Sequence, residues 1–432
     1  MSTEAPAGGR DDRQDDSQDG PRDGAQRENR RTTLSYPGDL LGFVDDLTEL
    51  ERAKLLTLRA HLDEHVRPLL PDYWERAEHL AHIREPLASL RLEDDPALLQ
   101  DDGRIGALYR GFRTIEMCRA DLSVSMTYGG QVGMFRTLVL EGASAEQIAR
   151  WDRDILEFRM TGCFALTEPD HGSDIAGGLS TTARRQGDGW VLNGAKRWIG
   201  NATISDHLVV VAREENDGGP SGSGRDGRRG RVLAFVVPAS ADGVQRSVIE
   251  HKAALRSVHN ADILLENVVV PEELRLPRIE SFADINRAFR TLRPEIAWSS
   301  AGMQLATYES ALDYAQQREQ FGRPIASFQL VQDKLVRIVE NIAQTLALAV
   351  RTTTHPVGDD VNPSLIKLIA GNRLRESAAL AREIVGGNGL LLEHEVIRYF
   401  VDAEAMYTFE GTREMNTLIL GRALTGHSAF VR

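Results

Sequence analysis

The sequence predicts an α+β protein, mainly helical, in which a helical segment, a β-rich segment and a second helical segment follow one another. Apolar residues recur every three to five positions from about residue 39 to residue 154 and again after Pro277. β-branched runs bounded by Gly, Pro and Asn fill the region between them. The chain of 432 residues is 41% hydrophobic, which is enough for several cores. The predicted limits are a tail at 1–35, an N-terminal helical domain at 36–160, a middle β domain at 161–276 and a C-terminal helical bundle at 277–432.

The first 35 residues contain no Val, Ile, Phe, Trp or Tyr, and Leu34 is their one large aliphatic residue besides Met1. Such a segment cannot bury enough apolar surface to offset its ordering entropy, which predicts a disordered tail. Beyond it, the leucines at 47, 50, 55, 58 and 62 have the spacing of an amphipathic helix. Glycines and prolines then divide the segment into several helices.

The β segment begins near Gly162. In "WVLNGAKRWIG" the Asn193-Gly194 pair predicts a hairpin turn, because both residues tolerate positive φ. The runs "HLVVVARE", "RVLAFVVPAS" and "ADILLENVVVP" predict further strands. The stretch "ENDGGPSGSGRDGRRGR" predicts an exposed loop, and it lacks the glycine spacing of a phosphate-binding loop.

The last segment predicts long helices packed as an antiparallel bundle. Leu335, Ile338, Ile342 and Leu346 step by three and four. The run "SLIKLIAGNRLRESAALAREIVGG" ends at a glycine pair suited to a left-handed helix C-cap.

Composition excludes several classes of function. The net charge of −13 leaves no basic face for nucleic acid. No apolar run approaches the ~20 residues of a membrane span, and no signal-peptide core opens the chain, so we expect a cytoplasmic protein. Cys118 and Cys163 cannot form a disulfide framework, and no His/Asp/Glu cluster has metal-ligand spacing, so no metal is expected.

Four stretches have the residue types of a binding or catalytic site. They are "CFALTEPDHGSD", "NGAKRWIGN", "REQFGRPIASFQLVQ", and "REIVGGNGLL" followed by "EAMYTFEGTR". Each also has an ordinary structural interpretation, as a polar turn, a core tryptophan, a helix cap or a solvated acid. The hydroxyls and free N–H groups of the first stretch suit carbonyls, ring nitrogens or phosphates.

In their order along the chain these stretches resemble the acyl-CoA dehydrogenase flavoprotein family. The resemblance covers roughly residues 39–430, with particular likeness to the branch of glutaryl-CoA dehydrogenase and plant-type short-chain acyl-CoA oxidase. It implies an N-terminal helical domain, a middle β-barrel or sandwich and a C-terminal four-helix bundle. It also implies FAD as cofactor, an acyl-CoA substrate, a homotetramer, and a role in fatty acid or amino acid catabolism.

The resemblance assigns cofactor contacts residue by residue. Thr167 would donate a hydrogen bond to the flavin, and Trp198 would stack beside it. Gly200 stands where many members have a threonine bonded to flavin N5, so oxygen reactivity is expected to differ. The cofactor-binding residues implied are Phe164, Leu166, Thr167, Trp198, Gly200, Arg318, Phe321, Gln329, Glu383, Gly386, Gly387 and Thr412.

For the substrate, the resemblance places Gly172 and Ser173 along the pantetheine–pyrophosphate path and Arg293 below the catalytic loop. Arg119 would meet the distal carboxylate of a glutaryl group, or else pair with nearby acids. Leu292 occupies the position where some branches carry the base, and Glu295 lies off register. The remaining acid, Glu410 beside Gly411, is therefore implied to be the catalytic base.

The implied reaction is α,β-dehydrogenation to a trans-2-enoyl-CoA, in which Glu410 removes the α-proton and flavin N5 accepts the β-hydride. Electrons would pass to an electron-transfer flavoprotein. Alternatives are an oxidase that uses O2, a glutaryl-CoA-type oxidative decarboxylation, and a carrier-protein-linked dehydrogenase of a biosynthetic pathway. A relative that binds FAD without catalysis is a further alternative.

Overall fold

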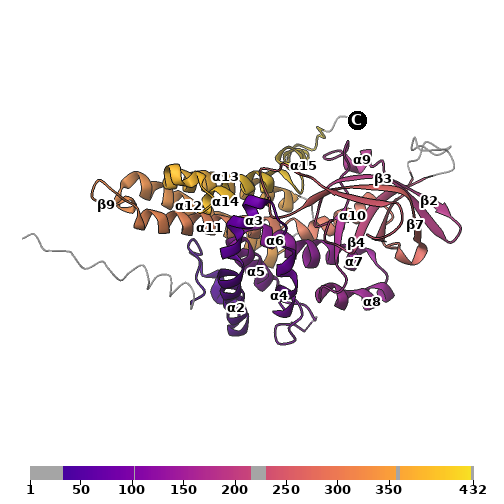
Figure 1. Ribbon diagram of the computed structural model, residues 1–432, viewed down its shortest axis with the longest axis horizontal. Coiled ribbons are helices and arrows are strands. Elements are labelled where there is room, and N and C mark those ends of the chain that lie inside the picture. The colour runs from indigo at the N-terminus through magenta and orange to yellow at the C-terminus, as the bar shows by residue number, and fades with distance from the viewer. Residues whose placement is uncertain (1–32, 102, 216–229, 357–360, 430–432) are drawn as a thin grey trace, which may run out of the picture.

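The computed structural model describes residues 33–101, 103–215, 230–356 and 361–429. Most of the predicted tail and most of the predicted loop at 215–231 lie outside the described residues. Leu34, assigned to the tail from the sequence, instead packs into a hydrophobic core with 8% of its surface exposed. The mainly helical α+β architecture is confirmed, with the helical bundle at one end of the molecule and the sheet at the other (Figure 1).

The N-terminal segment consists of helices joined by turns, with an isolated β-bridge between Leu99 and Ile105. Capping boxes begin two of its helices, since Thr48 and Ser144 each accept a hydrogen bond from the backbone three residues on. A π-helical turn at Gly130–Phe135 continues directly from α6. The helices are α2 (Glu49–His65), α3 (Leu70–Arg76), α4 (Arg84–Ser89), α5 (Ala107–Ala120), α6 (Leu122–Gly129), α7 (Arg136–Gly142) and α8 (Ala145–Leu156).

The middle segment forms one seven-stranded sheet of order β1-β4-β2-β3-β7-β6, with β5 paired to β4. β1 and β4 run parallel, whereas β3 and β7 form a long antiparallel pair. The strands are β1 (Gly162–Ala165), β2 (Thr182–Gln186), β3 (Gly189–Gly200), β4 (His207–Glu214), β5 (Val232–Pro238), β6 (Val244–Val248) and β7 (Asn260–Pro271), with the short helix α9 (Ile175–Gly178) after β1.

The predicted hairpin turn at Asn193-Gly194 is wrong. β3 runs through this pair without reversing, and the turn between β2 and β3 lies earlier, where Gln186 pairs with Gly189. The register of β3 against β7 shifts between Leu192 and Gly194, so the pair forms an irregularity within a strand. Glycine is required there, because a Cβ at Gly194 would lie 2.6 Å from the Thr181 hydroxyl.

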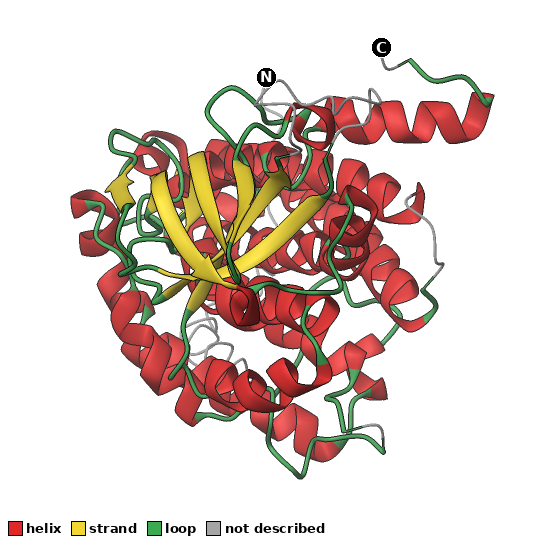
Figure 2. Cartoon of the chain, turned by 90° about the vertical axis from the view of Figure 1, so that its right-hand side faces the viewer, coloured by secondary structure: helices red, strands yellow, loops and turns green. Residues whose placement is uncertain are grey.

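The C-terminal segment is a bundle of long helices, and Figure 2 shows α15 extending from it toward the C-terminus. α13 ends at Val385, and Gly386 has φ +64°, which confirms the predicted left-handed cap. The elements are α10 (Phe282–Leu292), α11 (Glu295–Gln317), β8 (Glu319–Gln320), β9 (Arg323–Pro324), α12 (Gln329–Thr354), α13 (Val361–Val385), α14 (Val396–Thr408) and α15 (Arg413–Thr425).

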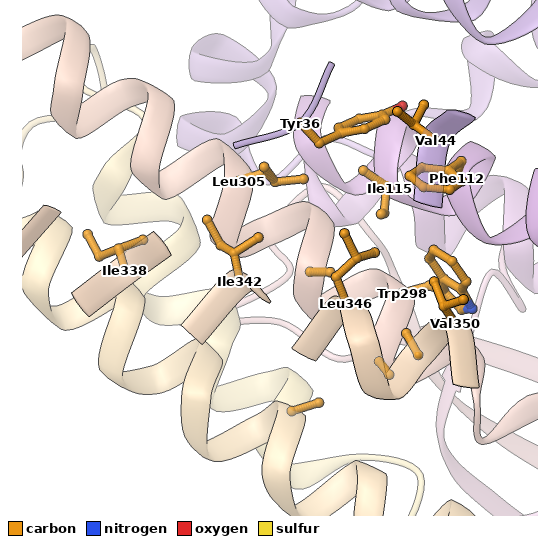
Figure 3. Close-up of a cluster of buried hydrophobic side chains, with 14 of the residues drawn as sticks. Tyr36, Val44, Phe112, Ile115, Trp298, Leu305, Ile338, Ile342, Leu346 and Val350 are labelled. Atoms are coloured by element: carbon orange, nitrogen blue, oxygen red, sulfur yellow. The ribbon is translucent and has the colours of Figure 1, made fainter. Parts of the chain in front are cut away.

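The largest core joins the N-terminal helices to the bundle (Figure 3). Phe112 and Ile115 of α5 face Trp298 and Leu305 of α11, while Ile342 of α12 closes the cluster. The approach of α5 to α11 depends on Gly111, because a Cβ there would lie 2.2 Å from the Trp298 ring. No helix in the described ranges is long and apolar enough to span a lipid bilayer.

A smaller core joins all three segments and positions the candidate site. Leu122 of α6, Leu255 and Val258 of the loop between β6 and β7, and Met406 of α14 pack together, with Phe409 at the edge. The buried Asp402 carboxylate of α14 accepts a hydrogen bond of 2.6 Å from the Leu255 N–H. The turn after α14, which carries Glu410, therefore lies where the three segments meet.

Candidate active site

Glu410 lies in a strained turn between α14 and α15. Its φ is +54°, a conformation uncommon outside glycine, and Gly411 follows at φ +90°. The amide of Asn416, which is 1% exposed, donates hydrogen bonds of 3.0 Å to the carbonyls of Gly411 and Thr412. Thr412 caps α15, with its hydroxyl accepting a hydrogen bond from the Met415 N–H. The turn is therefore fixed from its C-terminal side.

Three charged side chains act on the half-buried Glu410 carboxyl. Burial raises its pKa to about 7, although Lys367 and Arg293 oppose the rise and Glu295 adds to it. A carboxylate that titrates near neutrality suits a general base. Glu295, described from the sequence as off register, is thus electrostatically coupled to Glu410, and it is held by Arg110 at 3.3 Å and the Thr114 hydroxyl at 3.1 Å.

The motif at 163–174 and the one at 193–201 are joined by a buried ion pair that the sequence analysis did not single out. The Lys196 ammonium of β3 donates to the Glu168 carboxylate at 2.8 Å and to the Leu166 carbonyl at 3.0 Å. Glu168 also accepts from the Thr181 N–H at 2.9 Å, and burial opposes its ionisation, but Lys196 and these donors lower its pKa to about 2. The sequence does contain a sign of this ion pair, because a glutamate and a lysine within apolar, strand-like runs are buried only when they are paired.

Trp198 lies at a bulge of β3, where the register against β7 shifts between Lys196 and Ile199. Its φ is +65° and the residue is 52% exposed, an unusual state for a tryptophan in a strand. The Asn260 amide donates to the Trp198 carbonyl at 3.2 Å. Asn201, also at positive φ, donates to the Met126 and Thr127 carbonyls of α6. The Arg197 N–H of the bulge donates to the Thr167 carbonyl at 2.8 Å, so the Trp198 ring, with the Arg197 guanidinium 5.5 Å from its centroid, lies beside the 163–174 turn.

The other residues of the first motif divide into two groups. Among the described residues, the hydroxyls of Thr167 and Ser173 have no hydrogen-bond partner, and space is open at Gly172. Phe164 and Leu166 instead point into the core: Phe164 meets the Phe289 ring at 6.0 Å, and Leu166 is buried. Phe164 is half-buried and Leu166 is 6% exposed, and their contact with a flavin ring stays a prediction.

Gly200 is the last residue of β3 and pairs with Asn260. A Cβ at this position would lie 3.7 Å from the Asn260 amide nitrogen, an ordinary van der Waals contact. Crowding therefore does not account for the absence of a side-chain hydroxyl here.

Arg318, Phe321 and Gln329 lie at or beside the β8–β9 hairpin, at the end of the bundle remote from the sheet (Figure 1). All three are exposed, Phe321 to 95%, and in the described part of the chain the side chains of Arg318 and Gln329 make no hydrogen bond. One chain therefore does not bring them to Trp198.

The glycine pair Gly386-Gly387 lies at the end of α13, near the same end of the bundle, since Asn388 bonds to the Tyr314 hydroxyl at 3.1 Å. Glu383 one turn earlier forms an ion pair of 2.7 Å with Lys334. Its carboxylate is thus already engaged within the chain.

Arg119 is committed to an internal ion pair. Its guanidinium meets Glu309 of α11 at 2.7 Å, with Glu116 and Asp63 also within 4 Å, and the side chain is 7% exposed. The predicted contact with a distal substrate carboxylate therefore receives no support, whereas pairing with nearby acids, the alternative interpretation, is what the structure has. Arg293 is half-buried after α10, with its guanidinium 5.7 Å from the Phe289 ring centroid. Across the described ranges, no three His, Cys, Asp or Glu side chains gather as metal ligands.

Comparison with known proteins gives two family matches. Residues 163–268 match the middle domain of acyl-CoA dehydrogenase, and residues 282–425 match its C-terminal domain. The mitochondrial short-chain specific acyl-CoA dehydrogenase of Mus musculus is 31% identical over 313 residues, 71% of this chain and 73% of its own. The caffeyl-CoA reductase–Etf complex subunit CarC of Acetobacterium woodii is 31% identical over 292 residues, 66% of this chain and 74% of its own.

Two solved structures of glutaryl-CoA dehydrogenase from Mycobacterium smegmatis, one in complex with FADH2, superpose with TM-scores of 0.82. They are 32% and 28% identical to this chain, and each alignment covers 92% of it and 100% of theirs. Both helical segments and the sheet thus have their counterparts in these enzymes. With the two domain matches and the relatives above 30% identity, this chain belongs to the acyl-CoA dehydrogenase family of flavin-dependent oxidoreductases.

Proposed function

We propose that this protein is an FAD-dependent dehydrogenase that converts an acyl-CoA thioester to the trans-2-enoyl-CoA, with Glu410 as the base. The observation that carries the proposal is Glu410 itself, a carboxyl on a clamped, strained turn whose burial raises its pKa to about 7. At neutral pH a useful fraction is ionised and able to accept a proton, while the proton affinity stays high enough to drive the transfer.

The turn supplies more than the carboxylate. Among the described residues, the Glu410 N–H makes no backbone hydrogen bond, so it is available to a thioester oxygen. Fixed N–H groups stabilise the negative charge that develops on such an oxygen when the α-proton leaves. The left-handed turn, clamped by Asn416, holds the N–H and the carboxylate in one arrangement. Arg293, which acts on Glu410 electrostatically, lies at this same junction.

The residues present fit an FAD. Trp198 offers an exposed aromatic face, the Thr167 hydroxyl is without a partner among described residues, and Gly172 and Ser173 leave an open, polar turn beyond it. FAD bound there would supply the acceptor for the hydride from the β-carbon. The residues of the β8–β9 hairpin region and of the glycine pair after α13 lie at the end of the bundle remote from the sheet and would reach the cofactor from a second copy: Arg318, Phe321, Gln329, Gly386 and Gly387. We therefore propose a homo-oligomer with shared cofactor sites, of which a homotetramer is the form expected from the resemblance.

The substrate is not proposed to be glutaryl-CoA. Arg119 is the cation that would meet its distal carboxylate, and Arg119 is buried against Glu309. Freeing it would leave the Glu309 carboxylate uncompensated, which is costly. An acyl-CoA without a distal negative charge is favoured.

Gly200 supports a second candidate, an oxidase that delivers electrons to O2. The position lacks the hydroxyl that many family members place near flavin N5, although the backbone has room for one. The relative from Acetobacterium woodii is named as a subunit of an Etf complex, which supports an electron-transfer flavoprotein as the acceptor instead. We propose the dehydrogenase as the main activity.

Anaerobic titration of the purified yellow protein with a panel of acyl-CoAs tests the proposal. We expect flavin bleaching by at least one acyl-CoA, and none in Glu410→Gln, which should keep its FAD. Unchanged bleaching in Glu410→Gln would remove Glu410 as the base. Retained FAD with no bleaching by any acyl-CoA would favour a binding protein, and oxygen uptake at the rate of turnover would favour the oxidase.

A further inference from the structure

A buried lysine faces the Glu410 turn from α13. Lys367 is 3% exposed, and its ammonium donates a short hydrogen bond to the Met406 carbonyl in the last turn of α14. It also lies 5.4 Å from the centroid of the Phe409 ring. A cation at a helix C-terminus meets the carbonyls that have no partner in the helix, and it interacts favourably with the helix dipole. Lys367 thus holds the end of α14 immediately before Glu410.

Lys367 complements Asn416 on the other side of the turn. Asn416 fixes the carbonyls of Gly411 and Thr412, whereas Lys367 fixes that of Met406. Positive φ at Glu410 costs free energy that the surrounding contacts must offset. The two side chains bracket the strained residue.

The charge of Lys367 has a second consequence. Within the described residues, the charged groups that act on Glu410 are Lys367 from α13, Arg293 at the end of α10, and Glu295 at the start of α11. Burial lowers the pKa of Lys367 to about 8, and Glu410 opposes this change. The ammonium is therefore the cation of α13 that stabilises the ionised base.

We propose that Lys367 is a positioning residue for Glu410, which fixes the turn through the Met406 carbonyl and stabilises the Glu410 carboxylate through its charge. The catalytic part of this inference rests on the function proposed above, but the electrostatic part does not. Family resemblance assigns no role to this residue, and the proposal depends on its burial and contacts in this chain.

Difference infrared spectroscopy can follow the protonation of Glu410 without substrate, because Glu410→Gln identifies its carboxyl band. Lys367→Gln keeps a donor for the Met406 carbonyl but removes the charge, and Lys367→Arg keeps the charge. We expect the Glu410 midpoint to rise by about one pH unit, tenfold in proton affinity, in Lys367→Gln and to return toward the original value in Lys367→Arg. Lys367→Met, which removes both the charge and the donor, should also disorder the turn. If this variant does not fold, the comparison of Lys367→Gln with the unaltered protein still tests the proposal.

Arg375→Met is the matched control. Arg375 lies on the same helix, pairs with Glu404 of α14 at 2.7 Å and stacks 4.3 Å from the Tyr407 ring, but it is exposed. Its loss should leave the midpoint unchanged. In each variant, the pH below which the rate of flavin reduction declines should shift by the same amount as the midpoint of the Glu410 titration measured by infrared spectroscopy.

Equal Glu410 midpoints in the unaltered protein and Lys367→Gln, or an equal rise in Arg375→Met, would overturn the inference. Failure of the proposed function gives a different result, namely no flavin reduction by any acyl-CoA in the unaltered protein. The infrared midpoints still decide on Lys367 in that case.

Discussion

Breaking the Lys196–Glu168 pair should destabilise the junction of β3 with the turn at 166–168, where we propose that FAD binds. The two side chains are 0% and 1% exposed and 2.8 Å apart, and they connect β3 to the turn at 166–168. In Lys196→Met the Glu168 carboxylate stays buried without its cation. Removing one partner of a buried pair costs about 3–5 kcal/mol.

The pKa of Glu168 gives a similar magnitude. Its ordinary value of 4.5 falls to about 2 in the folded protein, and at 1.36 kcal/mol per unit this corresponds to about 3 kcal/mol. Because the folded pKa lies below the unfolded one, this stabilisation is fully present above pH 4.5 and is lost as the pH falls toward 2. In Lys196→Met burial raises the pKa of Glu168 instead, so the difference in stability between the protein and this variant should begin to shrink above pH 4.5 and shrink further toward pH 2.

The assay is thermal unfolding of the FAD-free protein from pH 3 to 7, with FAD content measured after reconstitution. With an unfolding entropy of about 2.1 cal/mol/K for each of the 432 residues, a loss of about 3 kcal/mol should lower the Tm by roughly 3 °C and reduce FAD retention. Lys54→Met is the matched control, since Lys54 and Asp95 are 2.7 Å apart but their side chains are 19% and 25% exposed, and such a pair contributes about 0–1 kcal/mol. Equal losses in the two variants, with FAD retention unchanged, would refute the reasoning.

Three further outcomes are expected. Because burial raises the pKa of Glu410 to about 7 and the ionised form is the base, flavin reduction should decline as the pH falls below about 7, and a rate that stays constant to pH 5 would contradict this. Gly200→Thr should fold normally and, if the added hydroxyl forms one hydrogen bond of about 1 kcal/mol, slow oxygen uptake roughly fivefold while acyl-CoA still bleaches the flavin. Phe321→Asp should shift sedimentation toward smaller species, since Phe321 is 95% exposed and burying such a side chain contributes about 1.5–3 kcal/mol, whereas Val269→Asp on the exposed face of β7 should not.

Local patterns in the sequence predicted the helices and strands well because burial enforces their periods. The 335, 338, 342 and 346 positions are all buried on α12, and the glycine after α13 takes the left-handed cap. The Asn193-Gly194 pair failed as a turn because its tolerance of positive φ serves a bulge equally well. The pairing of β3 with β7 determines that a bulge forms here and not a turn, and the two strands are distant in the sequence.

The candidate site was predicted in part. Glu410 and Trp198 could be singled out from the sequence because each belongs to a short motif of neighbouring residues, which is recognisable without knowledge of tertiary contacts. Lys367 and Asn416 could not be found in this way, because a single polar residue in a helix gains its meaning only from the carbonyl it meets. Arg119 is the opposite case. An arginine is a suitable residue for an anion site, but its guanidinium is already paired with Glu309, 190 positions away, and the sequence alone does not show this contact.

The residues with positive φ in the candidate site share one feature, namely a side-chain donor nearby that binds backbone carbonyls. Glu410, Trp198 and Asn201 all have positive φ. The turn at Glu410 is held by hydrogen bonds that Asn416 and Lys367 donate to backbone carbonyls. The Asn260 amide donates to the Trp198 carbonyl, and the Asn201 amide itself donates to the Met126 carbonyl. An amide donor binds a carbonyl directionally and does not change its charge with pH. Of these anchors Lys367 alone is ionisable, and it adjoins the one residue proposed to move a proton. The bulge of β3 at Trp198 and Asn201 is thus held by side-chain amides next to the Lys196–Glu168 ion pair, whereas the proposed proton transfer at Glu410 is coupled to a lysine whose burial lowers its pKa to about 8.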